Sequence, residues 1–156
     1  MAGLGRSPGP TASRRHRYLE GYAELGTGID VFYRAWRPLG EFRGVVVAVH
    51  GFAEHGARYS HVGEYLASRG YSFWIYDLRG HGMTARRSGE EGYVEDFEEF
   101  LEDTDSFVSF VMDEEGVDEV YLFGHSMGGH ILMQALERLP APQGLAIFGA
   151  PPLGKP

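Results

Sequence analysis

The sequence predicts an α/β fold with a mostly parallel sheet that begins with an antiparallel hairpin. After the hairpin, short apolar runs alternate with amphipathic segments in the order β-α-β-α-β-α-β. Such alternation places helices on both faces of a parallel sheet, joined by right-handed crossovers. Residues 44–49 form an unbroken apolar run, which is typical of a strand covered on both faces. The residues that carry chemistry directly follow three of the predicted strands, and such residues gather at the carboxyl ends of parallel strands.

Glycine and proline mark the ends of several predicted elements. Gly26-Thr27-Gly28 joins two β-prone runs as a hairpin turn, and Gly70 is placed as a helix stop. Pro140 and Pro142 separate the last helix from the last strand. The elements expected in chain order are a hairpin of residues 18–25 and 29–36, a strand at 44–49, a helix at 57–69, a strand at 71–76, an acidic helix at 94–112, a strand at 119–123, a helix at 131–139 and a strand at 144–148.

Length and composition fit one folded domain and exclude several classes of partner and chemistry. The chain has 156 residues, 43% of them hydrophobic, which suffices for a core. A net charge of −8 argues against nucleic acid and anionic membranes as partners. The chain has no cysteine, so disulfides and thiolate catalysis are excluded.

The amino-terminal residues 1–17 are rich in Gly, Pro, Ser and Arg and lack the apolar stretch of a signal peptide. We expect them to be a disordered segment that precedes a domain at residues 18–156. No window of the sequence approaches the roughly 18 apolar residues that span a bilayer. A cytoplasmic protein is therefore the expectation.

The junction Gly124-His125-Ser126-Met127-Gly128-Gly129 lies between a predicted strand and a predicted helix. A serine between glycines at such a turn is a nucleophile elbow, G-x-S-x-G, which presents its hydroxyl above the sheet. The Lys-Ser/Thr pair of a phosphate-binding loop and the spacing of a dinucleotide-binding motif are both missing. We therefore predict that Ser126 is a nucleophile and that the Met127 amide faces a developing oxyanion.

A second motif, His50-Gly51-Phe52-Ala53-Glu54-His55-Gly56, directly follows the predicted strand at 44–49. The loop after this strand supplies the second oxyanion donor in hydrolases with such an elbow, and Gly51 lets the backbone come close. The Phe52 amide is our candidate for that donor. The nucleophile Ser126 and the donors Phe52 and Met127 are expected to be supported by the neighbouring residues His50, Gly51, Gly124, His125 and Gly128. The histidines and Glu54 lack the H-E-x-x-H spacing of a metal site, so we expect no metal and no cofactor.

A third motif, Asp77-Leu78-Arg79-Gly80-His81-Gly82, follows the strand at 71–76. We expect a tight turn whose Asp and Arg fasten neighbouring loops below the site. A catalytic role for His81 is the less favoured alternative, and His130 is expected to serve packing or to lie on the surface.

Together, these three motifs resemble the α/β-hydrolase superfamily, and within it the monoacylglycerol lipase and lysophospholipase group, also described as serine aminopeptidase S33-like. The resemblance covers residues 18–148. It implies a serine ester hydrolase that acts on monoacylglycerol-like or lysophospholipid-like substrates through an acyl-enzyme, with Ser126 as nucleophile and Phe52 and Met127 as the oxyanion hole.

The resemblance also implies about eight strands and a triad in the chain order Ser, Asp or Glu, His. After Ser126 the sequence has one acid, Glu137, and one histidine, His130, and neither stands at a later strand end. We therefore expect the chain to be the amino-terminal part of such a domain, ending before the last strands and the lid, and to turn over little alone. Two alternatives stay open: one half of a split hydrolase, with a second chain supplying Asp and His, and a non-catalytic binding module.

Overall fold

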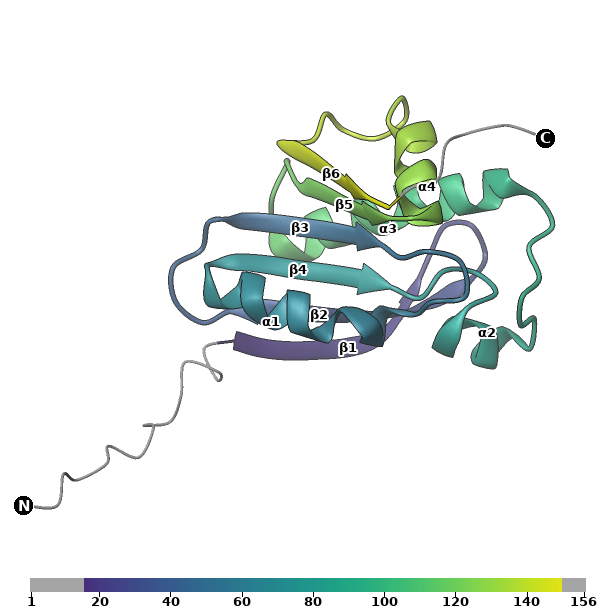
Figure 1. Ribbon diagram of the computed structural model, residues 1–156, viewed down its shortest axis with the longest axis horizontal. Helices are drawn as coiled ribbons and strands as arrows, with labels where there is room; N and C mark the ends of the chain where they lie inside the picture. Colours follow the sequence, from purple (N-terminus) through teal and green to yellow (C-terminus); the bar gives the residue numbers. More distant parts are fainter. Residues whose placement is uncertain (1–15, 150–156) are drawn as a thin grey trace, which may run out of the picture.

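A computed structural model describes residues 16–149 of the chain (Figure 1). Six strands form one sheet in the order β1-β2-β4-β3-β5-β6. The strands are β1 (His16–Glu24), β2 (Asp30–Pro38), β3 (Gly44–Val49), β4 (Tyr71–Tyr76), β5 (Tyr121–His125) and β6 (Gly144–Phe148). The helices are the short 3-10 helix η2 (Gly56–Tyr59) and the α-helices α1 (Ser60–Ser68), α2 (Gly82–Ser88), α3 (Phe97–Glu115) and α4 (Met127–Ala135).

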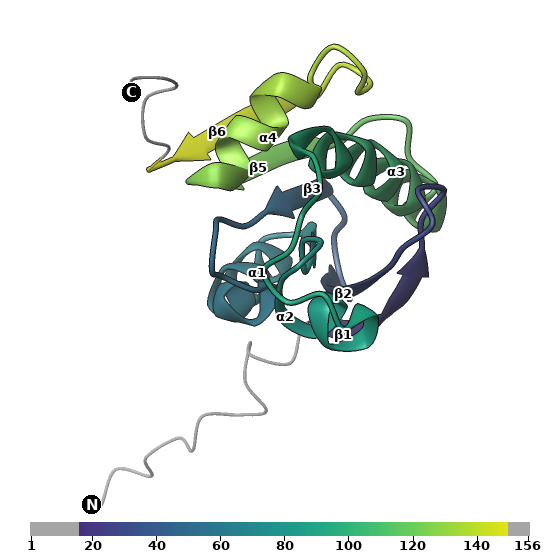
Figure 2. The same ribbon diagram turned by 90° about the vertical axis from the view of Figure 1, so that its right-hand side faces the viewer.

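The predicted fold class is confirmed. Strand β1 pairs antiparallel with β2, and β2 pairs antiparallel with β4. The pairs β4–β3, β3–β5 and β5–β6 are all parallel. Figure 2 shows α1 on one side of this twisted sheet and α3 and α4 on the other. Each side has its own core, because all six residues of β3 are buried and contribute side chains alternately to both faces.

The predicted bounds of β3, β4 and β6 are confirmed to the residue. Strand β1 begins at His16, so His16 and Arg17 belong to the sheet and not to the amino-terminal segment; the rest of that segment lies outside the described residues. Helix α3 begins at Phe97 rather than at residue 94, because the Asp96 side chain accepts a hydrogen bond from the Glu98 N–H and caps the helix.

Other elements also differ from the prediction, and the helix expected at 57–69 is divided into η2 and α1. Strand β5 lies two residues further along the chain than expected, and α4 begins at Met127, directly after Ser126, and ends at Ala135. Helix α2 was not predicted, because its seven residues begin with glycine and carry too few apolar side chains for a helical pattern.

Buried polar groups tie together the loops that follow β3 and β4. His50 donates from Nδ1 to the Gly51 carbonyl at 2.7 Å and accepts the Leu78 N–H at Nε2, at 3.0 Å. Since a carbonyl only accepts and an amide only donates, these partners fix the neutral tautomer with the proton on Nδ1. Burial lowers the pKa of His50 to about 4.

Asp77 and Arg79 fasten the neighbouring segments, as the sequence predicts. The Asp77 carboxylate accepts the Gly56 N–H at 2.7 Å and the Met83 N–H at 2.9 Å, and it pairs with Arg34 at 2.9 Å. Arg79 forms a bidentate pair with the buried Asp103 of α3, with both distances 2.9 Å. Both carboxylates are fully satisfied, so the turn after β4 is rigidly placed between β2, the loop after β3, and α3.

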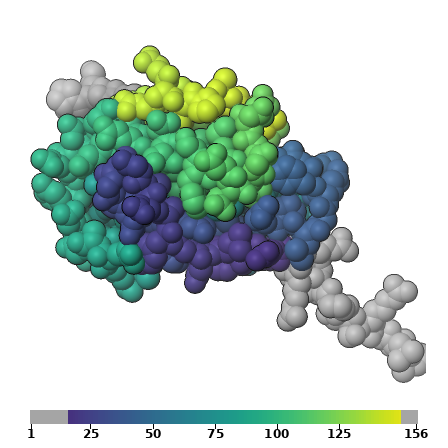
Figure 3. Space-filling model, turned by 180° about the vertical axis from the view of Figure 1, so that it is seen from behind, coloured from purple at the N-terminus to yellow at the C-terminus, as the bar shows by residue number. Residues whose placement is uncertain are grey.

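Strand β6 lies at the margin of the sheet, and Figure 3 shows its yellow segment along one edge of the molecule. Its Leu145 and Phe148 side chains are exposed. No helix within residues 16–149 is both long and apolar enough to cross a membrane.

We predict that His50 makes stability depend on pH between its unfolded and folded pKa values. Because the folded pKa is depressed, its contribution is present above about pH 6.5 and is lost as the pH falls toward 4. The free energy of unfolding should fall by about 2 kcal/mol between pH 7 and pH 5 from this group alone. Urea unfolding of the wild type and of His50→Gln at both pH values measures it.

The variant His50→Gln should lose most of this pH dependence, whatever its absolute stability. His61→Gln, which changes an exposed histidine on α1, is the matched control and should keep it. Equal pH dependence in the wild type and His50→Gln would contradict the assignment.

Candidate active site

Ser126 lies at the sharp turn between β5 and α4, with backbone angles φ 55° and ψ −121°. A non-glycine residue with positive φ is uncommon and costs on the order of 1–3 kcal/mol. Two hydrogen bonds hold the turn: the Ser126 N–H donates to the Phe148 carbonyl at 2.8 Å, and its carbonyl accepts the Gly129 N–H at 2.9 Å. The side chain is therefore presented at the carboxyl end of β5 on a fixed corner.

Glycine is required at the contacts around this corner. A Cβ on Gly124 would lie 2.7 Å from the Gly129 Cα, and one on Gly128 would collide with the Val49 carbonyl oxygen. A Cβ on Gly51 would lie 3.0 Å from the Ser126 Cβ. The structure thus brings the loop after β3 into direct contact with Ser126, as the sequence analysis expects of Gly51.

Two backbone N–H groups near Ser126 have no acceptor in the described part of the chain. Within residues 16–149, neither the Phe52 N–H nor the Met127 N–H makes a hydrogen bond. Met127 is the first residue of α4, so its N–H also lies at the positive end of the helix. Phe52 is 69% exposed, and its ring and the His81 ring pack edge to face, with centroids 5.7 Å apart. Unpaired donors at this place can bind an anionic oxygen.

Glu54 connects the loop after β3 to the end of β5. Its Oε1 accepts the Gly51 N–H at 2.9 Å and His125 Nδ1 at 2.7 Å, and the Tyr59 hydroxyl donates to it at 3.2 Å. Burial on its own raises the pKa of Glu54, but the hydrogen bonds from His125, Gly51 and Tyr59 outweigh it and leave the pKa lowered. Glu54 is therefore held as a carboxylate.

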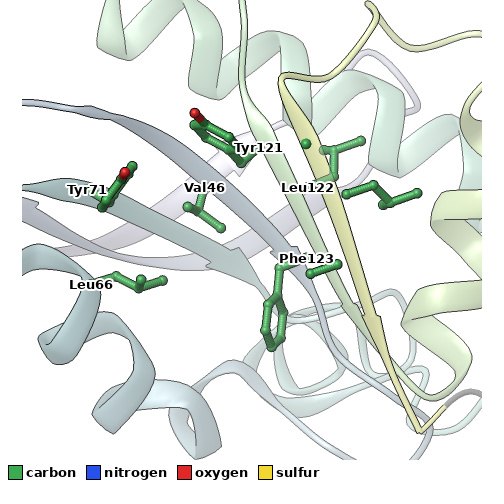
Figure 4. A pocket seen from close by; sticks show the side chains of 9 residues that line it. Val46, Leu66, Tyr71, Tyr121, Leu122 and Phe123 are labelled. Atoms are coloured by element: carbon green, nitrogen blue, oxygen red, sulfur yellow. The ribbon is translucent and has the colours of Figure 1, made fainter. Parts of the chain in front are cut away.

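A hollow of about 580 Å³ opens at Ser126. It is lined by aromatic and aliphatic side chains together with polar ones: Phe52, Glu54, Arg58, Tyr59, His61, Val62, Phe123, His125 and Ser126. A second hollow of about 360 Å³ lies between α1 and the strands β3, β5 and β6 (Figure 4). Figure 4 shows Val46, Leu66 and Phe123 around it, and it contains neither Ser126 nor any carboxylate or imidazole. Of these two hollows, only the first is lined by Ser126.

The histidines predicted for minor roles do not reach Ser126. His81 is buried and bonds through Nδ1 to the Arg79 carbonyl at 2.9 Å, and His130 Nδ1 is buried without a partner in the described part of the chain. His125 is turned toward Glu54. Among residues 16–149 no side chain hydrogen-bonds to the Ser126 hydroxyl, and no group of three metal-ligating side chains occurs.

Sequence reasoning missed the roles of Glu54 and Tyr59. Glu54 was considered above only as a possible metal ligand, and Tyr59 was not singled out. Glu54 and His125 are 71 residues apart in sequence, so their contact follows from the pairing of β3 with β5 and not from any local motif.

Comparisons with known proteins identify relatives of this chain. It is 34% identical to the monoacylglycerol lipase of Mycolicibacterium smegmatis over 83% of this chain and 45% of that protein. It is 34% identical to the monoglyceride lipase of Rattus norvegicus over 71% of this chain and 36% of that one. The structure of a carboxyl esterase from Bacillus coagulans superposes with a TM-score of 0.74 at 28% identity, over 83% of this chain and 43% of that one.

The chain thus spans less than half of the length of each of these proteins. The sequence model of the family described as serine aminopeptidase, S33 matches residues 40–155, which include every strand after the hairpin. This extent of agreement in sequence and in fold means that the chain belongs to the serine aminopeptidase S33 family of α/β-hydrolases, in its monoacylglycerol lipase-like group.

Proposed function

We propose that this chain supplies the nucleophile and the oxyanion hole of a serine hydrolase that cleaves carboxylic esters. The observation that carries the proposal is the backbone of Ser126 at φ 55°, held against Gly51, near two N–H groups that make no hydrogen bond within residues 16–149. Family membership supports an ester hydrolase of the lipase or esterase kind.

In the proposed reaction, the Ser126 Oγ attacks the ester carbonyl carbon while its proton passes to a base. The carbonyl oxygen becomes an oxyanion and accepts hydrogen bonds from the N–H groups of Phe52 and Met127. The carbon–oxygen bond to the alcohol then breaks, the alcohol leaves with a proton, and an acyl-enzyme forms. Water attacks the acyl-enzyme in the second half of the cycle and releases the carboxylic acid.

The base is proposed to lie outside residues 16–149, since no described side chain hydrogen-bonds to the Ser126 hydroxyl. Losing the base of a comparable triad costs on the order of 10⁶ in turnover, about 8 kcal/mol of barrier. The chain alone should therefore be a feeble catalyst. The comparisons do not support the expectation that a second chain supplies the acid and the histidine, and the proposal does not include one.

The substrate class is proposed to be an amphiphilic ester such as a monoacylglycerol or a lysophospholipid. Relatives named monoacylglycerol lipase and monoglyceride lipase support this class. The hollow at Ser126 combines the apolar Phe52, Val62 and Phe123 with the polar Arg58 and His125. Such a lining suits a molecule with an acyl chain and a polar alcohol.

We predict that hydrolysis of a short p-nitrophenyl ester by the purified chain and by Ser126→Ala will differ by less than about threefold. Once the base is absent, removing the nucleophile costs little more, because the two act as a unit. Adding imidazole as an external base should then raise the wild-type rate at least about tenfold above that of Ser126→Ala.

Two results would contradict the proposal: one concerns the absence of the base, and the other the identity of the nucleophile. Brisk serine-dependent turnover without imidazole would show that the base is already present. Equal rates for the two proteins in imidazole would show that Ser126 is not the nucleophile.

The oxyanion hole is tested by Phe52→Pro against Phe52→Ala. Both variants remove the exposed ring, but only proline removes the N–H, which makes no hydrogen bond in the described part of the chain. Labelling of Ser126 by a fluorophosphonate in the presence of imidazole, measured by intact mass, should be about 100-fold slower in Phe52→Pro than in Phe52→Ala. Similar rates in the two variants would remove Phe52 from the oxyanion hole.

A further inference from the structure

Glu54 lies between the loop that carries Phe52 and the strand end that carries Ser126. We propose that Glu54 is a positioning residue, whose carboxylate holds the Gly51–Phe52 backbone against Ser126 and so sets the direction of the Phe52 N–H. This inference rests on the proposed function, since it explains how one of its oxyanion donors is kept in place.

The loop between β3 and η2 needs such support because its turn is strained. The Glu54 N–H closes the turn on the Gly51 carbonyl with a long hydrogen bond of 3.3 Å. Ala53 stands inside the turn at φ 59°, in the left-handed region that favours glycine. Backbone in this conformation persists only where its surroundings fix it.

The Glu54 carboxylate provides that fixation from the inside of the turn. Its Oε1 accepts the Gly51 N–H at 2.9 Å, so the side chain folds back onto the backbone of its own loop. The same oxygen accepts His125 Nδ1 at 2.7 Å, which anchors the turn to the residue before Ser126. The Tyr59 hydroxyl, at 3.2 and 3.3 Å from the two oxygens, holds the carboxylate from the side of η2.

Gly51 lies close to both this carboxylate and the serine. A Cβ at Gly51 would lie 2.6 Å from Glu54 Oε1 and 3.0 Å from the Ser126 Cβ. The Gly51 peptide therefore has little freedom to rotate, and the N–H of the next residue, Phe52, takes its direction from it. A displacement of about 1 Å in such a donor costs on the order of 100-fold in rate.

The contacts of Glu54 suit a residue that holds the Gly51–Phe52 backbone in place. Its side chain is 14% exposed, and three donors already occupy Oε1. Within residues 16–149, Glu54 makes no hydrogen bond to the Ser126 hydroxyl, so its contacts give it no part in proton abstraction. The lowered pKa of Glu54 agrees with a carboxylate that stays ionised.

The test compares Glu54→Ala and Glu54→Gln with Glu64→Gln, which removes an exposed carboxylate from α1. Ser126 labelling by a fluorophosphonate in imidazole gives a maximal rate constant and a half-saturating probe concentration. In Glu54→Ala the rate constant should fall about 10- to 100-fold with the half-saturating concentration unchanged. Glu54→Gln should recover most of it, since its amide oxygen can still accept from Gly51 and His125.

A second measurement does not depend on labelling. In NMR spectra of the chain, amide hydrogen exchange at Gly51 should be at least about tenfold faster in Glu54→Ala than in the wild type, because that N–H loses its acceptor. The His125 Nδ1–H signal should be lost in the same variant, and Glu64→Gln should change neither.

The outcomes separate the two proposals. If the wild type is labelled at Ser126 but Glu54→Ala is labelled as fast, the positioning role is wrong and the proposed function stands. If labelling of the wild type does not need Ser126, the proposed function is wrong. Unchanged Gly51 exchange in Glu54→Ala overturns the positioning role whatever the labelling result.

Discussion

Three segments of the chain meet at Ser126, and the absence of a side-chain carbon at each contact makes the meeting possible. Gly124 lets the end of β5 touch the start of α4, and Gly128 lets α4 approach the end of β3. Gly51 brings the loop after β3 against the serine itself. Because Gly124 and Gly128 approach backbone atoms, no flexible side chain could relax at those two contacts. The strained conformation of Ser126 at φ 55° therefore persists on a rigid corner.

The polar groups below this corner are buried, and burial is costly unless every donor and acceptor finds a partner. Both ring nitrogens of the neutral His50 have partners, because Nδ1 donates to the Gly51 carbonyl and Nε2 accepts the Leu78 N–H. Asp77 satisfies it with two backbone N–H groups and Arg34, and Asp103 with Arg79 and Thr27. Each of these groups spans two segments distant in sequence. The carboxyl ends of β3 and β4 are thereby fixed before any substrate arrives, which is the condition under which backbone donors stabilise a developing charge.

The parts of the fold that the sequence predicted well are those governed by local pattern. The apolar run of β3, with residues buried on both faces, has no other stable arrangement than a central strand, and its bounds were confirmed. The glycines that flank Ser126, Gly124 and Gly128, likewise predicted the turn from local sequence alone. Helix α2 was missed because tertiary contacts, above all the Met83 N–H on Asp77, hold it and no periodic pattern does. The contact of Glu54 with His125 could not be predicted from the sequence either, because it depends on the pairing of β3 with β5.

The chain spans less than half of its relatives' length, yet it forms the turn that presents Ser126. The contacts that shape Ser126 within residues 16–149 come from β3, β5, α4, β6 and the loop after β3. Proton transfer needs something different in kind, a titratable side chain within hydrogen-bond reach of the hydroxyl, and that depends on a single well-placed residue. Donor geometry and proton transfer are thus physically separable in this fold. On the proposed function, a base brought to the hydroxyl would find the serine and the two proposed donors, the N–H groups of Phe52 and Met127, already in position.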